Sequence, residues 1–142
     1  MNIEDDEPIS QGRVYFIVAS KSGTVKVGFS ANLRKRMIDL QTSASEPLAL
    51  VFSCAGDREL ERALHAFLAP HVVSGEWFRY GPHIHDLIDE MWDFLSEKAV
   101  DDDEFRVPIT ADELRRIVTS PTYGKTDAEI HAACGNNVDN RP

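Results

Sequence analysis

Five side chains in the first half of the chain carry groups that could act together on a phosphodiester: Tyr15, Lys26, Arg36, Glu61 and His65. A phenol or an amine can position or deprotonate a water molecule, and a guanidinium can neutralise charge that develops on a phosphoryl group. A carboxylate is a hard oxygen ligand for Mg²⁺, which commonly uses only one or two protein carboxylates. The imidazole could orient the carboxylate, relay a proton or hold a softer metal. This set predicts metal-assisted chemistry on nucleic acid.

The first two of these residues fall on a predicted β-hairpin. Residues 13–20 and 24–30 alternate apolar and other residues on either side of a Lys-Ser-Gly turn, as strands of a hairpin do. Pairing their apolar faces places Tyr15, Lys26 and Gly28 together on the opposite face. Glycine weakens a strand unless something approaches its backbone closely, and an ammonium beside Tyr15 would lower the pKa of the phenol. The alternative is a packed tyrosine and an exposed lysine without a function.

A basic helix is expected over residues 31–43, with Ser30 as its N-cap. Its predicted buried stripe consists of Leu33, Met37 and Leu40. Arg36 borders this stripe, so its guanidinium would be held against the sheet as a phosphate clamp, or its stem would pack while its head stays in solvent. The candidate nucleic-acid-binding residues are Gly28, Ser30, Arg34, Lys35 and Arg36.

The carboxylate belongs to a second predicted helix, which begins at Gly56-Asp57 and ends near Ala69. Glu61 and His65 are four residues apart and therefore neighbours on one flank of it. Glu61 is the candidate ligand for Mg²⁺ or Mn²⁺, although a surface Glu–His pair without a role is the alternative. Glu76, in a Gly-Glu-Trp-Phe segment read as a turn or short strand, is a weaker candidate for a second carboxylate ligand.

The charge of the chain is unevenly distributed. The formal net charge is −9, but residues 13–45 hold six basic residues and one acidic residue, a local charge of +5. Phosphate binding responds to local positive potential, whereas the total charge predicts weak non-specific affinity for DNA or a need for a partner protein. The chain has no apolar run long enough to span a membrane and no secretion signal, and two free thiols are expected, so a cytoplasmic protein is predicted.

The pattern predicts an α+β fold, an α/β sandwich with a small three-stranded antiparallel sheet flanked by helices. The expected order is ββαβα, with the third strand over 47–54 buried and apolar, and a closing helix over 83–98. The expected divisions are a disordered acidic leader (1–12), the main domain (13–98), an acidic linker (99–109) and a short helical tail (110–142). In the tail, Thr110-x-x-Glu113 and Thr126-x-x-Glu129 have capping-box spacing. The tail has no assigned role, and a dimerising or partner-binding arm is one alternative.

Taken in order, these motifs resemble the GIY-YIG nuclease superfamily over residues 12–98. More narrowly, they are similar to its phage orf-type DNA-binding branch and the related meiotically up-regulated gene-like branch. Tyr15 matches the tyrosine of the first motif, whereas Lys26 stands where the second motif normally has a tyrosine; the leading Gly-Ile of the first motif is absent. The resemblance implies one divalent metal on Glu61 and a phosphate-neutralising Arg36. It further implies that Tyr15, or Lys26 when neutral, positions or deprotonates water.

Three functions are consistent with the sequence. The first is a metal-dependent endonuclease acting on DNA. The second is a DNA-binding module that kept the GIY-YIG fold without the chemistry, which the net acidity and the missing second tyrosine favour. The third is a protein-interaction domain with an unused site. The sequence does not determine the target or the oligomeric state.

Overall fold

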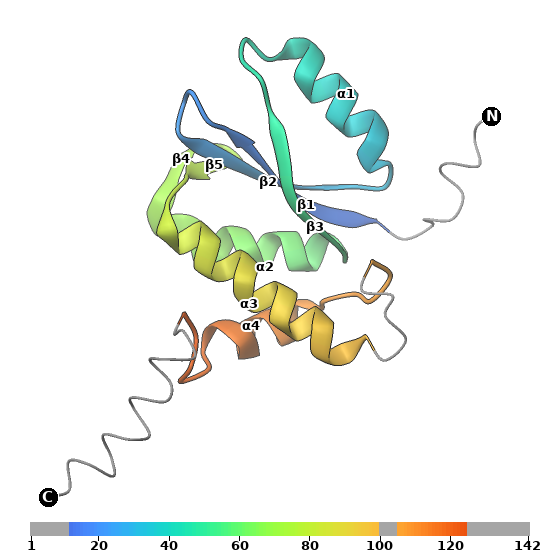
Figure 1. Cartoon of the computed structure of the whole chain (residues 1–142), viewed down its shortest axis with the longest axis vertical. Helices are drawn as coiled ribbons and strands as arrows, with labels where there is room; N and C mark the ends of the chain where they lie inside the picture. The colour runs from blue at the N-terminus through green and yellow to red at the C-terminus, as the bar shows by residue number, and fades with distance from the viewer. Residues whose placement is uncertain (1–11, 100–104, 125–142) are drawn as a thin grey trace, which may run out of the picture.

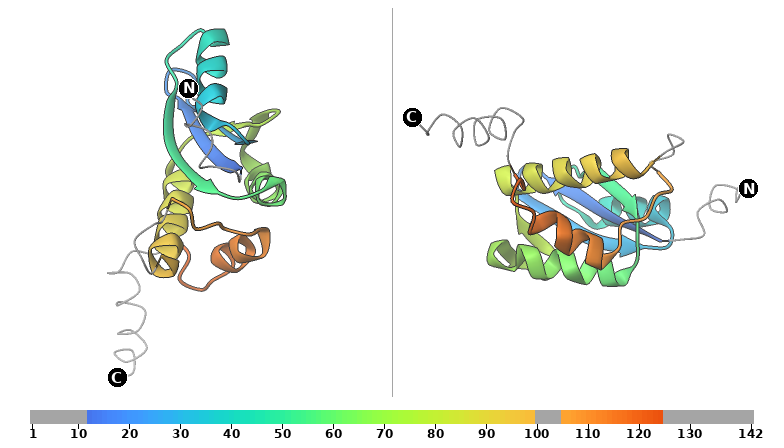
Figure 2. Two further views of the ribbon diagram at one scale, coloured as in Figure 1. Left: turned by 90° about the vertical axis from the view of Figure 1, so that its right-hand side faces the viewer. Right: turned by 90° about the horizontal axis from the view of Figure 1, so that it is seen from below.

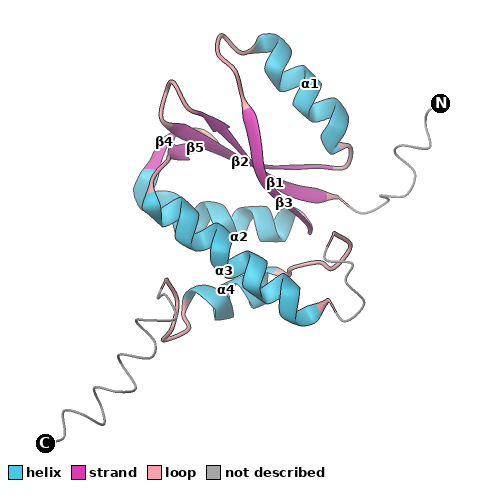
Figure 3. Cartoon of the chain, in the orientation of Figure 1, coloured by secondary structure: helices cyan, strands magenta, loops and turns pink. Residues whose placement is uncertain are grey.

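The computed structural model describes residues 12–99 and 105–124. Five strands are present there: β1 (Arg13–Ala19), β2 (Thr24–Ser30), β3 (Ala49–Ala55), β4 (Val72–Ser74) and β5 (Trp77–Arg79). Four α-helices accompany them: α1 (Leu33–Ser43), α2 (Arg58–Leu68), α3 (Pro82–Lys98) and α4 (Ala111–Val118), with a 3₁₀ turn, η2, at Ala69–His71. Figure 3 shows how the helices and strands are distributed.

The strands form one antiparallel sheet in the order β3-β1-β2-β5-β4. The predicted three-stranded sheet is therefore wrong, although the fold is α+β. The two further strands are three residues each, too short to show an alternating pattern in the sequence. They pair around a turn in which Gly75 has a φ of 57°, and Trp77 of β5 pairs with Lys26 of β2. The antiparallel sheet thus continues past the hairpin through a segment that the sequence predicted as a turn or short strand.

One face of the sheet carries the hydrophobic core. Apolar residues of β1 and β2 point into it, where they meet the buried faces of α2, α3 and α4. In Figures 1 and 2 these three helices lie together on one side of the sheet, and α1 lies apart from them at the opposite end of the molecule. The largest fully buried side chains on the core face include Phe16, Leu60, Leu64, Leu87 and Met91. The sheet and these helices provide the rigid support from which the candidate site is built.

The first helix is less firmly packed than its sequence suggests. No residue of α1 is fully buried, and the predicted stripe is only half-buried. The helix begins at Leu33, and its N-cap is Asn32, whose side chain accepts a hydrogen bond from the Lys35 N–H at 3.1 Å. The predicted N-cap, Ser30, is wrong because Ser30 ends β2 and its hydroxyl accepts from the Asn32 N–H at 2.9 Å. Ser30 therefore stabilises the turn that leads into the helix.

The third strand differs from its expected buried course. β3 begins two residues later than predicted and is one of the two edge strands of the sheet, with Leu50 and Val51 exposed. Its pairing with β1 shifts register between Phe16 and Ile17. A bulge of this kind blunts an edge strand against further pairing. An apolar run in the sequence cannot distinguish an edge strand from a central one, because both faces of either strand can be apolar.

Residues 105–124, which follow the gap in the described chain, pack onto the domain. The Thr110–Glu113 capping box is confirmed at the start of α4, and Leu114 and Ile109 enter the shared core. Pro108 forms an isolated parallel bridge with Ala55, and the Ile109 N–H donates to the Ala55 carbonyl at 3.1 Å. The second predicted capping box, at Thr126, lies outside the described residues. The beginning of the predicted tail thus belongs to the same core as the sheet.

Arg13 connects this segment to the sheet. Its guanidinium donates to Ser53 Oγ at 3.0 and 3.1 Å and to the Phe105 carbonyl at 2.7 Å, and it stacks 3.6 Å from the centre of the Phe105 ring. Burial lowers the pKa of Arg13 from its ordinary value. The local charge count over residues 13–45 included Arg13 as part of a phosphate-binding surface. Arg13 is only 4% exposed, so it does not contribute to such a surface.

Two further findings concern properties expected from composition. Cys54 is a free, buried thiol, and burial raises its pKa to about 12, so it is not a reactive nucleophile. Cys134 lies outside the described residues. Among residues 12–99 and 105–124, no helix is long and apolar enough to cross a membrane.

Replacing Arg13 with Gln is expected to lower the free energy of unfolding by about 1–3 kcal/mol, because hydrogen bonds to a buried charged group are lost. Urea unfolding measures this, and amide hydrogen exchange should rise most at residues 105–118. Arg62→Gln is the control, since Arg62 is exposed and pairs only along its own helix with Glu59. Equal stability of the two variants would contradict the role assigned to Arg13.

Candidate functional site

The site is built around a close contact across the first hairpin. Tyr15 of β1 is the direct cross-strand partner of Gly28 of β2, which agrees with the predicted shared face. A Cβ placed on Gly28 would lie 2.5 Å from Cζ of Tyr15 and 3.0 Å from its Cε1, so the ring lies directly over the glycine. Only a residue without a side chain can occupy this position. The close approach that glycine predicted is therefore made by the neighbouring ring, and contact of Gly28 with nucleic acid stays a prediction.

Charged groups from three other elements influence the pKa of Tyr15. Burial raises the pKa of Tyr15 above 10.0, Arg36 lowers it, and Glu76 and Glu61 raise it further. Arg36 of α1, Glu61 of α2 and Glu76 of the β4–β5 turn thus lie within electrostatic reach of one phenol. The expectation that Lys26 lowers the pKa of Tyr15 is wrong, because the net shift is upward and the cation that opposes it is Arg36.

Lys26 instead forms an ion pair. Its Nζ lies 2.8 Å from Oε1 of Glu76, and its side chain is only 14% exposed. The ammonium also lies 5.7 Å from the centre of the Trp77 ring. Lys26 pairs with Ile17 in the sheet, two positions along β1 from Tyr15, so the lysine lies diagonally across the same face. Glu76 is therefore brought to the site as the ion-pair partner of Lys26.

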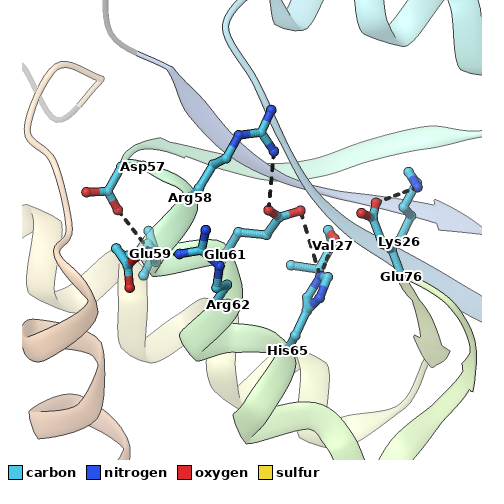
Figure 4. Close-up of polar contacts among 10 residues, drawn as sticks. Lys26, Val27, Asp57, Arg58, Glu59, Glu61, Arg62, His65 and Glu76 are labelled. Atoms are coloured by element: carbon cyan, nitrogen blue, oxygen red, sulfur yellow. Dashed lines mark hydrogen bonds and ion pairs between the residues drawn. The ribbon is translucent and has the colours of Figure 1, made fainter.

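Glu61 is the buried carboxylate of the site. It lies in the first turn of α2, where the helix dipole favours a negative charge, and the N-cap Asp57 accepts a hydrogen bond from the Leu60 N–H at 2.9 Å. Glu61 is 8% exposed. Its oxygens lie 3.8 Å from Nη1 of Arg58 and 4.0 Å from Nε2 of His65, both longer than a hydrogen bond (Figure 4). Within the described part of the chain, this buried carboxylate lies near two basic side chains, and the binding of a metal ion by it stays a prediction.

The donor set fits a hydrated divalent metal better than a fully protein-enclosed one. No group of three His, Cys, Asp or Glu side chains able to hold a metal is found within the described part of the chain. Mg²⁺ usually keeps several waters and needs only one or two carboxylates, which Glu61 can supply. A softer metal that requires several nitrogen or sulfur ligands does not fit this arrangement.

The geometry restricts the role of His65. Its Nε2–H donates to the Val27 carbonyl at 2.7 Å, and the ring packs 5.2 Å from the centre of the Phe78 ring. Nε2 is therefore bonded to the sheet and is not free to bind a metal. The predicted proton relay stays a prediction. Nε2 of His65 lies 4.0 Å from Glu61, and orientation of that carboxylate by His65 stays a prediction.

The basic residues of α1 differ from one another in their surroundings. Lys35 is exposed and pairs with Asp39 at 3.2 Å along the helix. Arg36 is also exposed rather than held against the sheet, yet it lies near enough to Tyr15 to lower the pKa of the phenol. The guanidinium of Arg36 is thus both open to a ligand and close to the site.

Sequence reasoning missed Arg58. This residue begins α2 three positions before Glu61, and its guanidinium lies 4.7 Å from the centre of the Phe29 ring. The i, i+3 spacing from a candidate ligand is the signal that could have identified it. The position of Phe29 beside it could not be anticipated, because it depends on how β2 and α2 pack.

The fold and site together define an α+β domain with a buried phenol, a buried carboxylate and an exposed guanidinium at one end of its sheet. The chain belongs to the T5orf172 domain family, a phage-associated family whose match covers residues 12–102. That match includes every residue of the site described above. Comparison with curated proteins and with solved structures gives no match.

Gly28→Ala is expected to destabilise the protein by about 1–3 kcal/mol, because a Cβ forces the Tyr15 ring from its position. Thermal or urea unfolding measures the loss. In a Tyr15→Ala background the same substitution should cost much less, since the ring atoms are absent, and the double-mutant cycle gives the coupling directly. Additive costs would show that the two residues do not depend on each other.

The pKa of Tyr15 should rise further in Arg36→Gln, because this change removes the group that lowers it. The ¹³Cζ resonance of Tyr15, followed against pH, measures the pKa of Tyr15 in the wild-type protein and in Arg36→Gln. Lys35→Gln is the control on the same helix. The pKa of Tyr15 is higher in the folded protein than in the unfolded chain. Its neutral form therefore contributes stability to the fold that is complete below about pH 10 and is lost as pH rises through the pKa of the folded protein. An unchanged titration in Arg36→Gln would place Arg36 away from the phenol.

Proposed function

We propose that this chain is a metal-dependent nuclease of the GIY-YIG type, which binds DNA and hydrolyses a phosphodiester bond. The observation that carries the proposal is the combination of Tyr15, packed over Gly28, with the buried carboxylate Glu61 of α2. The charges of Glu61 and of Arg36 in α1 both act on the phenol of Tyr15. Membership of a phage-associated family that is linked to GIY-YIG-like nuclease-type proteins supports it. The ordered motifs from Tyr15 to the Gly-Glu-Trp-Phe segment support the same assignment.

Each side chain has a role that follows from its surroundings. Glu61 would hold Mg²⁺ or Mn²⁺, and a bound divalent ion would supply neutralisation of charge at a phosphate oxygen or leaving group. Arg36 is exposed beside the site and would bind the phosphoryl oxygens, where charge develops during hydrolysis. His65, fixed by the Val27 carbonyl, would keep Glu61 oriented.

Tyr15 would act in its protonated form. Since burial raises the pKa of the phenol above 10.0, it carries its proton at neutral pH. A neutral phenol can hold the attacking water by a hydrogen bond, but it is not a base that takes the water's proton. The Lys26–Glu76 ion pair would hold the other end of the same face in place. An ammonium group has no lone pair, so Lys26 in this pair would not act as the base.

A DNA-binding module without cleavage is the second candidate. Two observations favour it: the Lys26 ammonium is paired with Glu76, and the pKa of Tyr15 is raised rather than lowered. Neither residue is then an evident general base. In this case Arg36 would still bind a phosphate, and Glu61 would not be needed for affinity.

Nicking of supercoiled plasmid in Mg²⁺ or Mn²⁺ distinguishes these functions. Glu61→Gln is expected to reduce nicking by about 100-fold or more, the scale for loss of one group that stabilises a transition state. Glu59→Gln is the matched control, because Glu59 lies on the same helix, is exposed, and pairs with Arg62. Its activity should stay within about twofold of wild type, since exposed ion pairs contribute little.

Metal-dependent nicking that survives in Glu61→Gln would contradict the assignment of the metal to Glu61. Absence of nicking by wild type, together with DNA binding that Arg36→Gln weakens and Glu61→Gln leaves intact, would establish the second candidate in place of the first.

A further inference from the structure

Arg58 lies beside Glu61, the candidate metal ligand. The proposed hydrolysis assigns no role to Arg58. Its Nη1 lies 3.8 Å from Oε1 of Glu61, and its side chain is 65% exposed while that of Glu61 is 10% exposed. In Figure 4 the guanidinium approaches Glu61 from the side away from His65 and from the Lys26–Glu76 pair. The open side of the buried carboxylate therefore faces Arg58.

The guanidinium is held in a defined orientation by an aromatic ring. Cζ of Arg58 lies 4.7 Å from the centre of the Phe29 ring, a cation–π arrangement. The Phe29 ring in turn lies against Gly12, where an added Cβ would enter the ring and would be 3.3 Å from its Cδ1. A ring supported in this way gives Arg58 a fixed platform, and stacking on an aromatic face leaves the N–H groups at the edge of the guanidinium free to donate.

The contact with Glu61 does not account for this arrangement. At 3.8 Å it is longer than a hydrogen bond, and an ion pair with one exposed partner contributes little stability. Arg62 provides a comparison on the same helix, with nearly the same exposure, and it makes a close ion pair with Glu59 three positions before it. Arg58 also has a carboxylate three positions away, yet it lies on Phe29 and leaves Glu61 at a distance.

We infer that Arg58 is a positioning residue that binds a backbone phosphate of the nucleic acid next to the site at Glu61. A planar guanidinium presents two parallel donors to phosphate oxygens, and the first turn of α2 adds the positive end of the helix dipole. Arg36 and Arg58 belong to different elements, α1 and α2, so the backbone would be held at two points with Tyr15 and Glu61 within reach. This inference rests on the proposed function, because it assumes that DNA occupies the site.

Binding of a fluorescent DNA duplex tests the inference without catalysis. The measurements use the full chain in a Glu61→Gln background, with EDTA present, so that neither cleavage nor the ion pair with Glu61 contributes. Arg58→Gln should weaken binding by roughly tenfold and reduce the slope of log affinity against log salt by about 1, as expected for one lost phosphate contact. Arg62→Gln, the matched control, should change affinity by less than about twofold. Thermal unfolding establishes that each variant is folded.

Equal affinity of the Arg58→Gln and Arg62→Gln proteins would overturn the inference. In the otherwise wild-type protein, a lower Mg²⁺ requirement for nicking in Arg58→Gln, with KM for DNA unchanged, would also overturn it, because Arg58 would then only compete with the metal for Glu61. A raised KM with an unchanged Mg²⁺ requirement is the supporting result. Failure of the proposed function would give a different result. The wild-type protein would then not nick DNA, and Arg36→Gln would not change its affinity for DNA.

Discussion

The contact between the Tyr15 ring and the backbone of Gly28 is the constraint on which the site depends. It fixes the phenol in a buried position on the face of the sheet opposite the hydrophobic core. The charges of Arg36, Glu61 and Glu76 then act on this phenol. Because the ring rests on the paired strands β1 and β2, its position does not depend on the more loosely packed α1.

The two sides of the sheet differ in how firmly they are packed. On the core side, α2 buries Leu60, Leu64 and Leu68, which fixes Glu61 and His65 as part of a rigid unit. On the other side, α1 has no fully buried residue and presents exposed cations. A buried carboxylate needs a fixed framework because misplacement leaves its charge uncompensated, whereas a guanidinium that binds a phosphate gains from being able to follow its ligand. The structure therefore combines a firmly packed acidic helix with a basic helix that is less deeply buried.

The electrostatics of the site are dominated by burial and by pairing within the protein. Lys26 and Glu76 neutralise each other, and the pKa of the phenol is raised by burial despite the nearby Arg36. A site of this kind holds a neutral hydrogen-bonding group between an acidic and a basic one. In the proposed function, this neutral phenol would orient the attacking water molecule.

Local patterns in the sequence by themselves determined the β1–β2 hairpin, the shared face of Tyr15 and Lys26, the carboxylate helix and the capping box at Thr110. These features follow from alternation, helical spacing and capping, which act between residues close in the chain. Tertiary structure alone decided that Arg13 is buried against Phe105, that β4 and β5 extend the sheet, that Lys26 pairs with Glu76, and that Arg58 stacks on Phe29. Each of these joins residues whose proximity depends on how whole elements pack, and no local periodicity encodes that packing.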